Sequence, residues 1–324
     1  GDKDAGRRLM QESGVPTIPG TEIPEDAAAA KAAAEKIGYP VMLKASAGGG
    51  GKGIRLVRAP EEIEQAFNTA SSEAQQAFGE GRMYMEKYIY PPKQIEVRLL
   101  CDDQGNVVCL GERECSIQRN NQKLIEESPS PGVSKEKRRE LFAAATKAAK
   151  AVGYVNAGTV EFLMDKDKNF YFMEMNTRLQ VEHPVSELVT GKDIVKWQIR
   201  IAAGVELDCT QDDIKVRGAA IECRINAGGV GKVNFLHIPS GPWVRFDTFL
   251  YQGYEVPPFY DSMLGKMIVF SSTREEAIRK MQSALCELVI GGLPNNIENQ
   301  IDIIRDPVFQ SGDYYTDFIK NREG

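Results

Sequence analysis

Two glutamates, Glu161 and Glu174, lie in short alternating apolar runs on either side of a polar turn at residues 165–169. Such runs are typical of the two strands of a β-hairpin. If the hairpin is centred on the turn, the two carboxylates face each other, and Asn176 shares the face of Glu174 because side chains alternate along a strand. Paired oxygen ligands suit a divalent cation such as magnesium, which usually also binds substrate phosphates. The spacing therefore predicts a metal site at Glu161, Glu174 and Asn176.

Three further polar residues follow at the same spacing of two: Arg178, Gln180 and Glu182. We expect them to extend the polar side of the second strand, because every second side chain of a strand points to the same face. A face that only supports structure does not normally carry so many inward polar residues. The alternative is a solvated face on which the glutamates pair with lysine or arginine, an arrangement that is common and weak.

A run of four glycines follows a predicted strand that contains Lys44. The segment GGGGKG at 48–53 has the spacing GxGxxG, but a strand instead of a helix follows it, and the Walker A spacing is absent. We interpret it as a hairpin tip whose backbone N–H groups can surround phosphate oxygens, with the Lys44 ammonium nearby. The alternative is a plain mobile loop.

Two other regions carry groups suited to a nucleotide or an anion. Residues 85–88, MEKY, end a predicted strand, where the backbone can pair with a purine edge and Glu86 can accept an amino proton. Residues 118–123, QRNNQK, and Arg224 are rich in groups that bind anions. The alternatives are an ordinary edge strand, a surface loop and a salt-bridged arginine.

The elements that must position these residues alternate between strands and helices, and hairpins dominate. We expect a domain boundary at the YPP segment, residues 90–92, and a stretch too polar for a core at 116–134. Helices are expected over 2–14, 26–37, 60–78, 134–152, 184–203, 273–290 and 294–305. Strands are expected over 40–45, 54–58, 82–88, 94–101, 107–114, 219–226, 232–238 and 243–247, besides the hairpin at 165–169. The pattern predicts an α+β protein with mostly antiparallel sheets.

The composition is that of an ordinary globular enzyme, with 324 residues, 42% hydrophobic and 27% charged. The net charge of −6 and the absence of long Lys/Arg runs argue against a nucleic-acid surface. Six cysteines without a CxxC pair and only two histidines argue against zinc and indicate reduced cysteines in a cytoplasmic protein. No apolar stretch approaches the ~20 residues that span a bilayer. We therefore expect neither a nucleic-acid partner nor a membrane.

Taken in order, these segments resemble biotin carboxylase, the ATP-grasp component of acetyl-CoA carboxylase and of propionyl-CoA and pyruvate carboxylases. The matching segments are KASAGGGGKG, MEKY, ERECSIQRNNQK, AGTVEF, FMEMNTRLQVEHPV, ECRINA and YDSMLGK. The resemblance runs from Gly1 to about Phe318. It implies an ATP-grasp fold with a mobile lid and a biotin-carboxylase-type C-terminal subdomain. The implied parts are a lead-in helix at 1–17, the lid at 18–88, the core at 89–204 and the C-terminal subdomain at 205–324.

The resemblance also implies a reaction, the ATP- and magnesium-dependent carboxylation of biotin by bicarbonate through carboxyphosphate, as in fatty acid biosynthesis. Biotin is the substrate there, free or on a biotin carboxyl carrier protein. The residues that the resemblance assigns to ATP are Lys3, Lys44, Gly48, Gly49, Gly50, Gly51, Glu86, Lys87, Gln94, Gln118 and Asn121. Lys3 and Lys44 would contact the phosphates, while Glu86 and the backbone of Lys87 would hold adenine.

The same resemblance assigns the remaining polar residues to metal and bicarbonate. Two magnesium (or manganese) ions would be bound by Glu161, Glu174 and Asn176. Bicarbonate would be held by Lys123, Arg178, Gln180, the backbone of Val181, and Glu182. Glu182 would be the base that deprotonates it, and Arg224 would stabilise carboxyphosphate and the biotin enolate. Such a base stays ionised near neutral pH, because neighbouring positive charge favours the carboxylate.

The sequence departs from the family pattern in three places. The family has a further nucleotide-fold domain, of about a hundred residues, before the part matched by Gly1. That domain contributes to the family's homodimer, so the dimer is left open for this chain. A short GGVG connection follows Ala227, where the family has a longer loop, and this resembles a deliberately trimmed scaffold. Gln94, Arg98 and Asn120 replace residues that are His, Gln and Arg in the family.

Two alternatives to biotin carboxylation follow from these departures. A truncated or engineered ATP-grasp scaffold could join another carboxylate to an amine through an acyl phosphate. A nucleotide-binding remnant could bind Mg-ATP without turnover. The sequence does not separate these alternatives, because the residues assigned to metal, bicarbonate and base are all present.

Overall fold

The computed structural model describes residues 3–21, 26–46 and 53–323, with side chains from residue 6 onward. It divides into two compact units, Gly1–Tyr90 with Asp167–Met173, and Pro91–Lys166 with Glu174–Gly324. The first unit therefore ends within the YPP segment. The finer division into four parts remains a prediction. Within the described ranges, no helix is long and apolar enough to cross a membrane.

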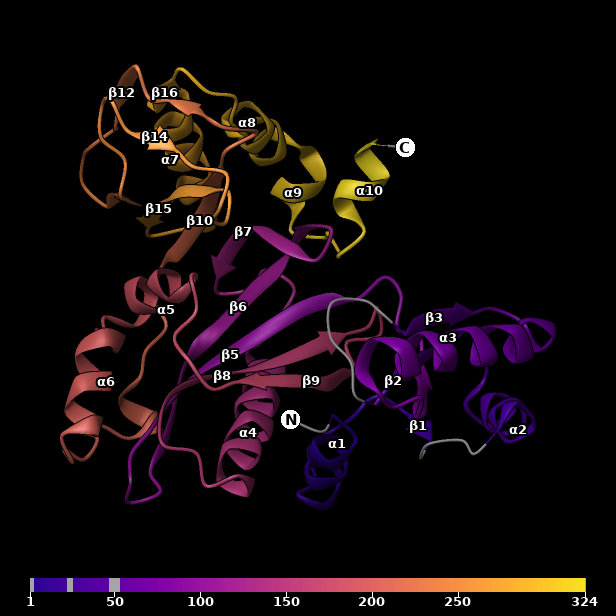
Figure 1. Cartoon of the computed structure of the whole chain (residues 1–324). Helices are drawn as coiled ribbons and strands as arrows, with labels where there is room; N and C mark the ends of the chain where they lie inside the picture. The colour runs from indigo at the N-terminus through magenta and orange to yellow at the C-terminus, as the bar shows by residue number, and fades with distance from the viewer. Residues whose placement is uncertain (1–2, 22–25, 47–52, 324) are drawn as a thin grey trace. The chain divides into compact units, whose positions relative to one another are not determined.

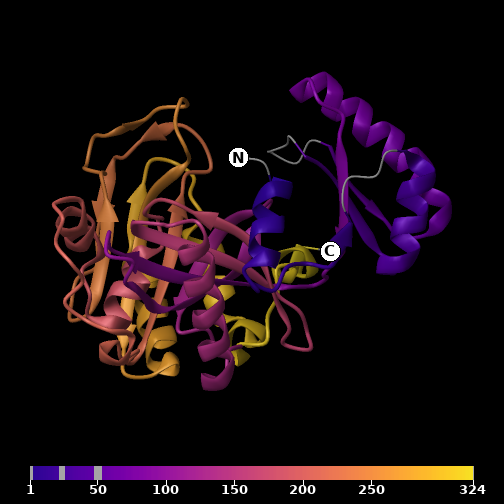
Figure 2. The same ribbon diagram turned by 90° about the horizontal axis from the view of Figure 1, so that it is seen from below.

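The first unit contains a four-stranded antiparallel sheet in the order β1-β4-β2-β3. Its strands are β1 (Gly20–Thr21), β2 (Val41–Ala45), β3 (Ile54–Val57) and β4 (Met83–Lys87). Its helices are α1 (Lys3–Glu12), α2 (Ala27–Ile37) and α3 (Ile63–Phe78), the last entered through the 3-10 turn η1 (Pro60–Glu62). Helices α2 and α3 lie on one face of the sheet (Figure 2). Small alanine side chains on both helices are fully buried there, which permits this close packing.

The second unit is built on an eight-stranded sheet in the order β13-β15-β10-β7-β6-β5-β8-β9 (Figure 1). Its strands are β5 (Lys93–Cys101), β6 (Val107–Arg119), β7 (Gln122–Ser128), β8 (Asn156–Met164), β10 (Ala219–Asn226), β13 (Val244–Thr248) and β15 (Met263–Ser271). The sheet also contains β9 (Phe170–Asn176), of which residues 174–176 belong to this unit. Neighbouring strands from β13 to β8 pair antiparallel. The α+β fold with mostly antiparallel sheets is confirmed. Helix α4 (Lys135–Ala151), capped by Ser134, packs on β5 and β6.

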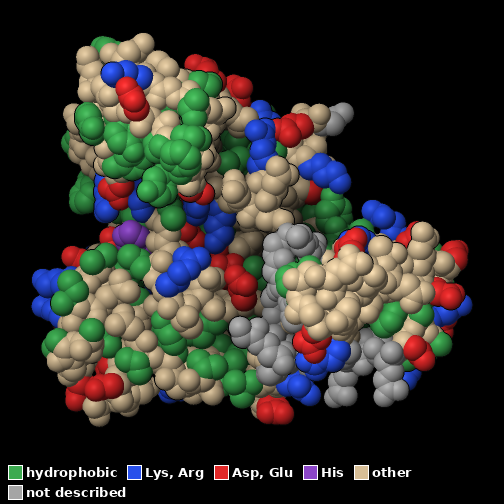
Figure 3. Space-filling model, viewed as in Figure 1, with side chains coloured by type: hydrophobic (Ala, Val, Ile, Leu, Met, Phe, Trp, Pro, Cys, Tyr) green, Lys and Arg blue, Asp and Glu red, His purple; other side chains and the backbone are tan. Residues whose placement is uncertain are grey.

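The C-terminal elements form a second hydrophobic core on β10 and β15. They are β11 (Gly231–Lys232), β12 (Phe235–His237), β14 (Glu255–Val256), β16 (Val289–Gly291), α7 (Arg274–Glu287), α8 (Ile297–Arg305), α9 (Pro307–Ser311) and α10 (Phe318–Glu323). The 3-10 turn η2 (Gln211–Asp213) lies before β10 in the chain and contacts β6 instead. Hydrophobic side chains also gather on the surface of this region (Figure 3). In the short GGVG connection Gly231 has no room for a side chain, because a Cβ would lie 2.6 Å from that of Leu293.

The structure corrects three expectations about the elements. The single helix predicted over 184–203 is two helices, α5 (His183–Thr190) and α6 (Ile194–Ala202). Gly191 ends the first in a left-handed conformation with φ of 70°, and the Asp193 side chain caps the second. The strand predicted over 232–238 belongs to two short strands in different sheets. The stretch 116–134 is not too polar for a core, because most of it lies in β6 and β7 of the large sheet.

Candidate active site

Strand β5 carries a row of polar side chains on one face. Gln94, Glu96 and Arg98 alternate with aliphatic residues, and every residue of the strand is buried. A buried polar group without a partner costs roughly 2 kcal/mol or more, so these side chains need partners inside the protein. Across the sheet, Glu96 faces Arg113 of β6 on one side and Glu161 of β8 on the other. The partners of this row define the candidate site.

Lys123 is the centre of the charge cluster around this row. Its ammonium donates to Glu96. It also lies 2.8 Å from Oε1 of Glu182 and 3.5 Å from Oε1 of Glu161. The guanidinium of Arg113 lies 2.7 Å from Oε2 of Glu96. Three carboxylates thus surround two cations, and the arrangement brings together residues from β5, β6, β7 and β8 and from the start of α5.

Glu182 is held by cations on both sides. Besides Lys123, Nη2 of Arg224 lies 3.0 Å from its Oε2, and Nη2 of Arg113 lies 3.9 Å from its Oε1. Burial alone raises the pKa of Glu182, but the positive charges of Lys123, Arg113 and Arg224 outweigh it and hold the pKa below its ordinary value. The carboxylate is therefore ionised at neutral pH, as expected for a base among cations.

Two residues outside the predicted set position the groups around Glu182. Glu126 of β7 accepts from Arg224, with its Oε1 2.5 Å from Nη2 and 2.6 Å from Nε. Lys266 of β15 donates to the backbone carbonyl of Val181. These contacts fix the guanidinium of Arg224 and the main chain just before Glu182.

The predicted metal residues lie together at the edge of the sheet, where β8 neighbours β9. Nδ2 of Asn176 lies 2.7 Å from Oε1 of Glu161 and 3.3 Å from Oε1 of Glu174. Burial, followed by the negative charge of Glu96, raises the pKa of Glu161 to about 8. This crowding of carboxylates is what a divalent cation would relieve, and the donor set of two carboxylates and an amide oxygen fits magnesium or manganese. The residues present therefore fit the metal that the sequence predicts.

Gln94 and Gln118 connect this edge to the neighbouring strands. Nε2 of Gln118 lies 2.5 Å from Oε1 of Gln94, and Nε2 of Gln94 lies 2.7 Å from Oε2 of Glu161. Asn121, in contrast, is exposed at the tip of the β6–β7 hairpin. The assignments of all three residues to ATP remain predictions.

The polar extension beyond β9 does not continue the strand as predicted. Strand β9 ends at Asn176, and residues 177–182 form neither strand nor helix before α5 begins at His183. Gln180 and Glu182 point into the cluster, but Arg178 is exposed, and no carboxylate in the described ranges lies at ion-pair distance from it. Its guanidinium donates to the carbonyl of Leu179 at 3.2 Å. The expected five-residue row along one strand is therefore wrong, since a strand would have turned Arg178 to the same face as Glu182.

The predicted ATP residues of the first unit form a separate group. Lys44 of β2 donates to the carboxylate of Glu86 on β4. The backbone N–H of Lys87 donates to the carbonyl of Pro19 at 2.7 Å, so a purine pairing with Lys87 would use its carbonyl oxygen. Gly48, Gly49, Gly50 and Gly51 lie outside the described residues, as does the side chain of Lys3.

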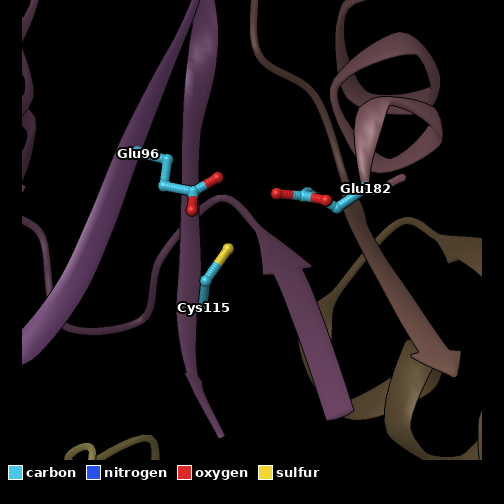
Figure 4. A group of neighbouring side chains, drawn as sticks. All are labelled: Glu96, Cys115 and Glu182. Carbon is cyan, nitrogen blue, oxygen red and sulfur yellow. The ribbon is translucent and has the colours of Figure 1, made fainter. Parts of the chain in front are cut away.

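Glu96, Cys115 and Glu182 are the one group of three or more His, Cys, Asp or Glu residues, among those described, whose ligand atoms all lie within 4.8 Å of one another. The two carboxylates point toward each other, with the sulfur beside them (Figure 4). Lys123 and Arg113 already neutralise the carboxylates. Burial raises the pKa of Cys115 well above its ordinary value, so the thiol is protonated. We therefore assign no metal to this cluster.

Glu96, Arg113, Glu126 and Lys266 are the site residues that the sequence analysis missed. A signal existed for Glu96, since QIEVR places polar residues at every second position of an otherwise apolar strand. Arg113 stands in a run of three adjacent charged residues, 112–114, which shows no such alternation. Glu126 and Lys266 carried no local signal. They meet the site only because β7, β10 and β15 are neighbours in the sheet.

Known proteins share both this fold and this sequence. The family model "Carbamoyl-phosphate synthase L chain, ATP binding domain" matches residues 2–210, and "Biotin carboxylase C-terminal domain" matches residues 222–321. The chain is 49% identical to a biotin carboxylase from Nostoc sp., over 99% of this chain and 74% of that protein.

Two solved structures are similar throughout. One is the biotin carboxylase–β,γ-ATP complex from Campylobacter jejuni, with a TM-score of 0.93 and 48% identity over 99% of this chain and 73% of that one. The other is the biotin carboxylase domain dimer of Hydrogenobacter thermophilus 2-oxoglutarate carboxylase with MgADP, ADP and bicarbonate, with a TM-score of 0.92 and 47% identity over 100% of this chain and 73% of that one. This chain belongs to the biotin carboxylase family of ATP-grasp enzymes.

Proposed function

We propose that this chain carboxylates biotin with bicarbonate and Mg-ATP, and that the cluster around Lys123 is where bicarbonate reacts. The observation that carries the proposal is Glu182, a buried carboxylate held ionised by Lys123 and Arg224 beside a hairpin suited to magnesium. An ionised base next to cations and a metal site is what bicarbonate needs in order to attack the γ-phosphate of ATP.

Each group in the cluster has a distinct task in this reaction. Glu161, Glu174 and Asn176 would hold magnesium, which would neutralise charge on the phosphates. Arg178 and the amide of Gln180 hold the bicarbonate anion, and Glu182 removes its proton. Lys123 and Arg224 supply the positive charge that stabilises the carboxyphosphate formed next.

The cations around Glu182 also set its strength as a base. In the described geometry Lys123 and Arg224 both bind its carboxylate, and this makes Glu182 a weak base. When an anion shares these cations, the carboxylate loses part of that stabilisation and its affinity for a proton rises. The same cations then stabilise the negative charge that the bicarbonate gains.

The carrier of biotin and the assembly of the chain belong to the same proposal. A biotin carboxyl carrier protein is the natural source of biotin for a family with acetyl-CoA and pyruvate carboxylase members. The dimer named for the Hydrogenobacter thermophilus structure is a property of that protein. Nothing in the described residues favours ligation of another carboxylate to an amine.

The test is phosphate release from ATP by the purified chain, with bicarbonate and biotin each omitted in turn. We expect release to require both. The change Glu182→Gln should lower the rate at least about 100-fold, because it removes the base and keeps the shape. Glu112→Gln is the matched control, since Glu112 is equally buried and also binds an arginine, Arg138, away from the site.

The outcomes separate the alternatives. ATP cleavage that ignores both bicarbonate and biotin would contradict the proposed function. Binding of Mg-ATP in calorimetry without any cleavage would make the chain a nucleotide-binding module. A wild-type rate in Glu182→Gln would overturn only the assignment of Glu182 as the base, and not the proposed function.

A further inference from the structure

Arg98 is a buried cation without an anionic partner. It is 0% exposed, and among the residues with described side chains no carboxylate lies at ion-pair distance from it. Its guanidinium donates only to neutral oxygens: the carbonyl of Gly158 at 3.2 Å, the carbonyl of Arg178 at 3.4 Å, and Oε1 of Gln180 at 3.1 Å. Its Nε has no hydrogen-bond partner.

Such a residue works against stability. An ion moved out of water costs several kcal/mol unless an opposite charge compensates it. Burial, together with the positive charge of Arg113, lowers the pKa of Arg98 to about 9, so the group still carries its proton at neutral pH. The burial cost is partly offset by its hydrogen bonds to these three oxygens and by the more distant charges of Glu182 and Glu96.

The contacts of Arg98 fix the orientation of the Gln180 amide. Nη2 of Arg98 and Nη2 of Arg113 both donate to Oε1 of Gln180, at 3.1 and 2.7 Å. Nε2 of Gln180 then donates to Oε1 of Glu161 at 2.8 Å. The reversed amide would place its N–H groups against two guanidinium groups, which only donate. One N–H of Gln180 thus faces the predicted metal ligand Glu161, and the other is left for an anion.

The same guanidinium holds the main chain of this segment. Residues 177–182 have no strand or helix ladder to fix them. Nη1 of Arg98 binds the carbonyl of Arg178, and Nη2 binds the side chain of Gln180, so one planar group spans the stretch from 178 to 180. A lysine cannot reproduce this, because its ammonium is a single point charge and not a fork.

We propose that Arg98 is a positioning residue for bicarbonate, which holds Arg178 and the Gln180 amide in the arrangement that receives the anion. The inference deepens the proposed function and rests on it. Arg98 donates to the carbonyls of Gly158 and Arg178 and to Gln180, and to none of the predicted metal ligands, so it acts through Gln180 and the main chain of Arg178. Its loss should therefore weaken bicarbonate more than ATP.

The test compares the steady-state constants of the full chain with Arg98→Met, Arg98→Lys and wild type. We expect Arg98→Met to raise the KM for bicarbonate roughly tenfold and to leave the KM for ATP within about twofold. Arg98→Lys should not restore the bicarbonate KM, because it keeps the charge and loses the fork. In a Gln180→Ala background, Arg98→Met should have a much smaller effect, since the two residues act together.

The control is Arg138→Met. Arg138 lies on α4, away from the site, and donates two hydrogen bonds to the Glu112 carboxylate, at 2.6 and 2.7 Å. Arg138→Met should lower the melting temperature and leave the bicarbonate KM unchanged. Arg98→Met should show the opposite pattern for bicarbonate, with the KM for bicarbonate raised roughly tenfold and the KM for ATP within about twofold. The proposal is overturned if Arg98→Met keeps the wild-type KM for bicarbonate. It is also overturned if the variant loses stability and its KM values for bicarbonate and ATP rise equally.

Failure of the proposed function can be distinguished from failure of the role proposed for Arg98. If wild type lacks bicarbonate-dependent ATP cleavage, the proposed function fails, and a crystal structure of Arg98→Met decides the role of Arg98. An unmoved Gln180 amide and an unmoved main chain at 178–180 would then overturn it, and displacement of both would support it. If Arg98→Met does not fold, Arg98→Lys carries the same comparison.

Discussion

His183 occupies the first position of α5, directly after Glu182, and its Nδ1 lies 2.9 Å from the carbonyl oxygen of Gln180. Burial, followed by the positive charge of Lys266, lowers the pKa of His183 to about 4. The ring is therefore neutral at neutral pH, which suits a donor from Nδ1–H to that carbonyl. At this scale the site depends on keeping one imidazole uncharged among several cations.

This shift predicts how stability depends on pH. The folded pKa of about 4 lies below the unfolded value of about 6.5, so the unfolded chain binds more protons between them. The contribution of His183 is present above about pH 6.5 and is lost as the pH falls toward 4. We expect His183→Asn, which keeps a donor and cannot titrate, to reduce the fall in melting temperature between pH 7 and pH 5 by roughly 2 °C. If the melting temperatures of wild type and His183→Asn fall equally between pH 7 and pH 5, the proposed role of the imidazole is contradicted.

At the scale of elements, the hairpin of β6 and β7 explains two asparagines that the sequence assigned to a ligand-binding run. Arg119 pairs with Gln122, and Asn120 and Asn121 form the two-residue turn with φ of 51° and 63°. Positive φ at both central residues is the conformation of a type I′ turn, which favours asparagine and glycine. The turn alone is thus a sufficient reason for Asn121.

Two substitutions separate this structural role from a contact with ATP. Asn121→Ala should cost about 1 kcal/mol of unfolding free energy, because alanine is strained at positive φ, whereas Asn121→Gly should cost little. If the predicted contact exists, both variants lose the amide and both should raise the KM for ATP. We expect that rise, measured beside urea denaturation. An unchanged KM in Asn121→Gly would limit Asn121 to the turn.

At the scale of the whole molecule, contacts between the first strand of the second unit and residues near its C-terminus stabilise that unit. Nζ of Lys93 on β5 donates to the carbonyl of Tyr314 at 2.6 Å and to that of Gly312 at 3.2 Å, and it lies 3.6 Å from Glu114. Lys93 and Glu114 are both fully buried. Burial raises the pKa of Glu114, and the charge of Lys93 acts against that rise.

Removing this lysine should destabilise the second unit selectively. We expect Lys93→Met to cost about 3 kcal/mol, because it leaves two buried carbonyls without this donor and removes the positive charge beside Glu114. Both tryptophans of the chain, Trp197 and Trp243, belong to this unit, so their fluorescence in urea reports its unfolding. Lys166→Met, an exposed change, should stay within about 0.5 kcal/mol. Equal urea midpoints of unfolding for Lys93→Met and wild type would contradict the stabilising role of Lys93.

Local periodicity along the chain determined much of the fold. Alternation around 165–169 predicted the hairpin that brings Glu161 near Asn176, and the remaining motifs predicted the family. The single helix over 184–203 failed because Gly191 tolerates a left-handed end within an otherwise helical pattern. Polar composition misled the prediction for 116–134, because Glu126 and Glu127 are buried with arginine partners.

The sequence by itself determined which face of each strand is polar, because side-chain direction repeats every two residues and is a local property. Only the tertiary structure decided which charges meet. Glu126 reaches Arg224 across 98 positions of sequence, and Lys266 reaches Val181 across 85. These pairs depend on the strand order β15-β10-β7-β6-β5, which no local pattern encodes. Burial then makes each pairing obligatory, since an unpaired charge inside the protein is costly.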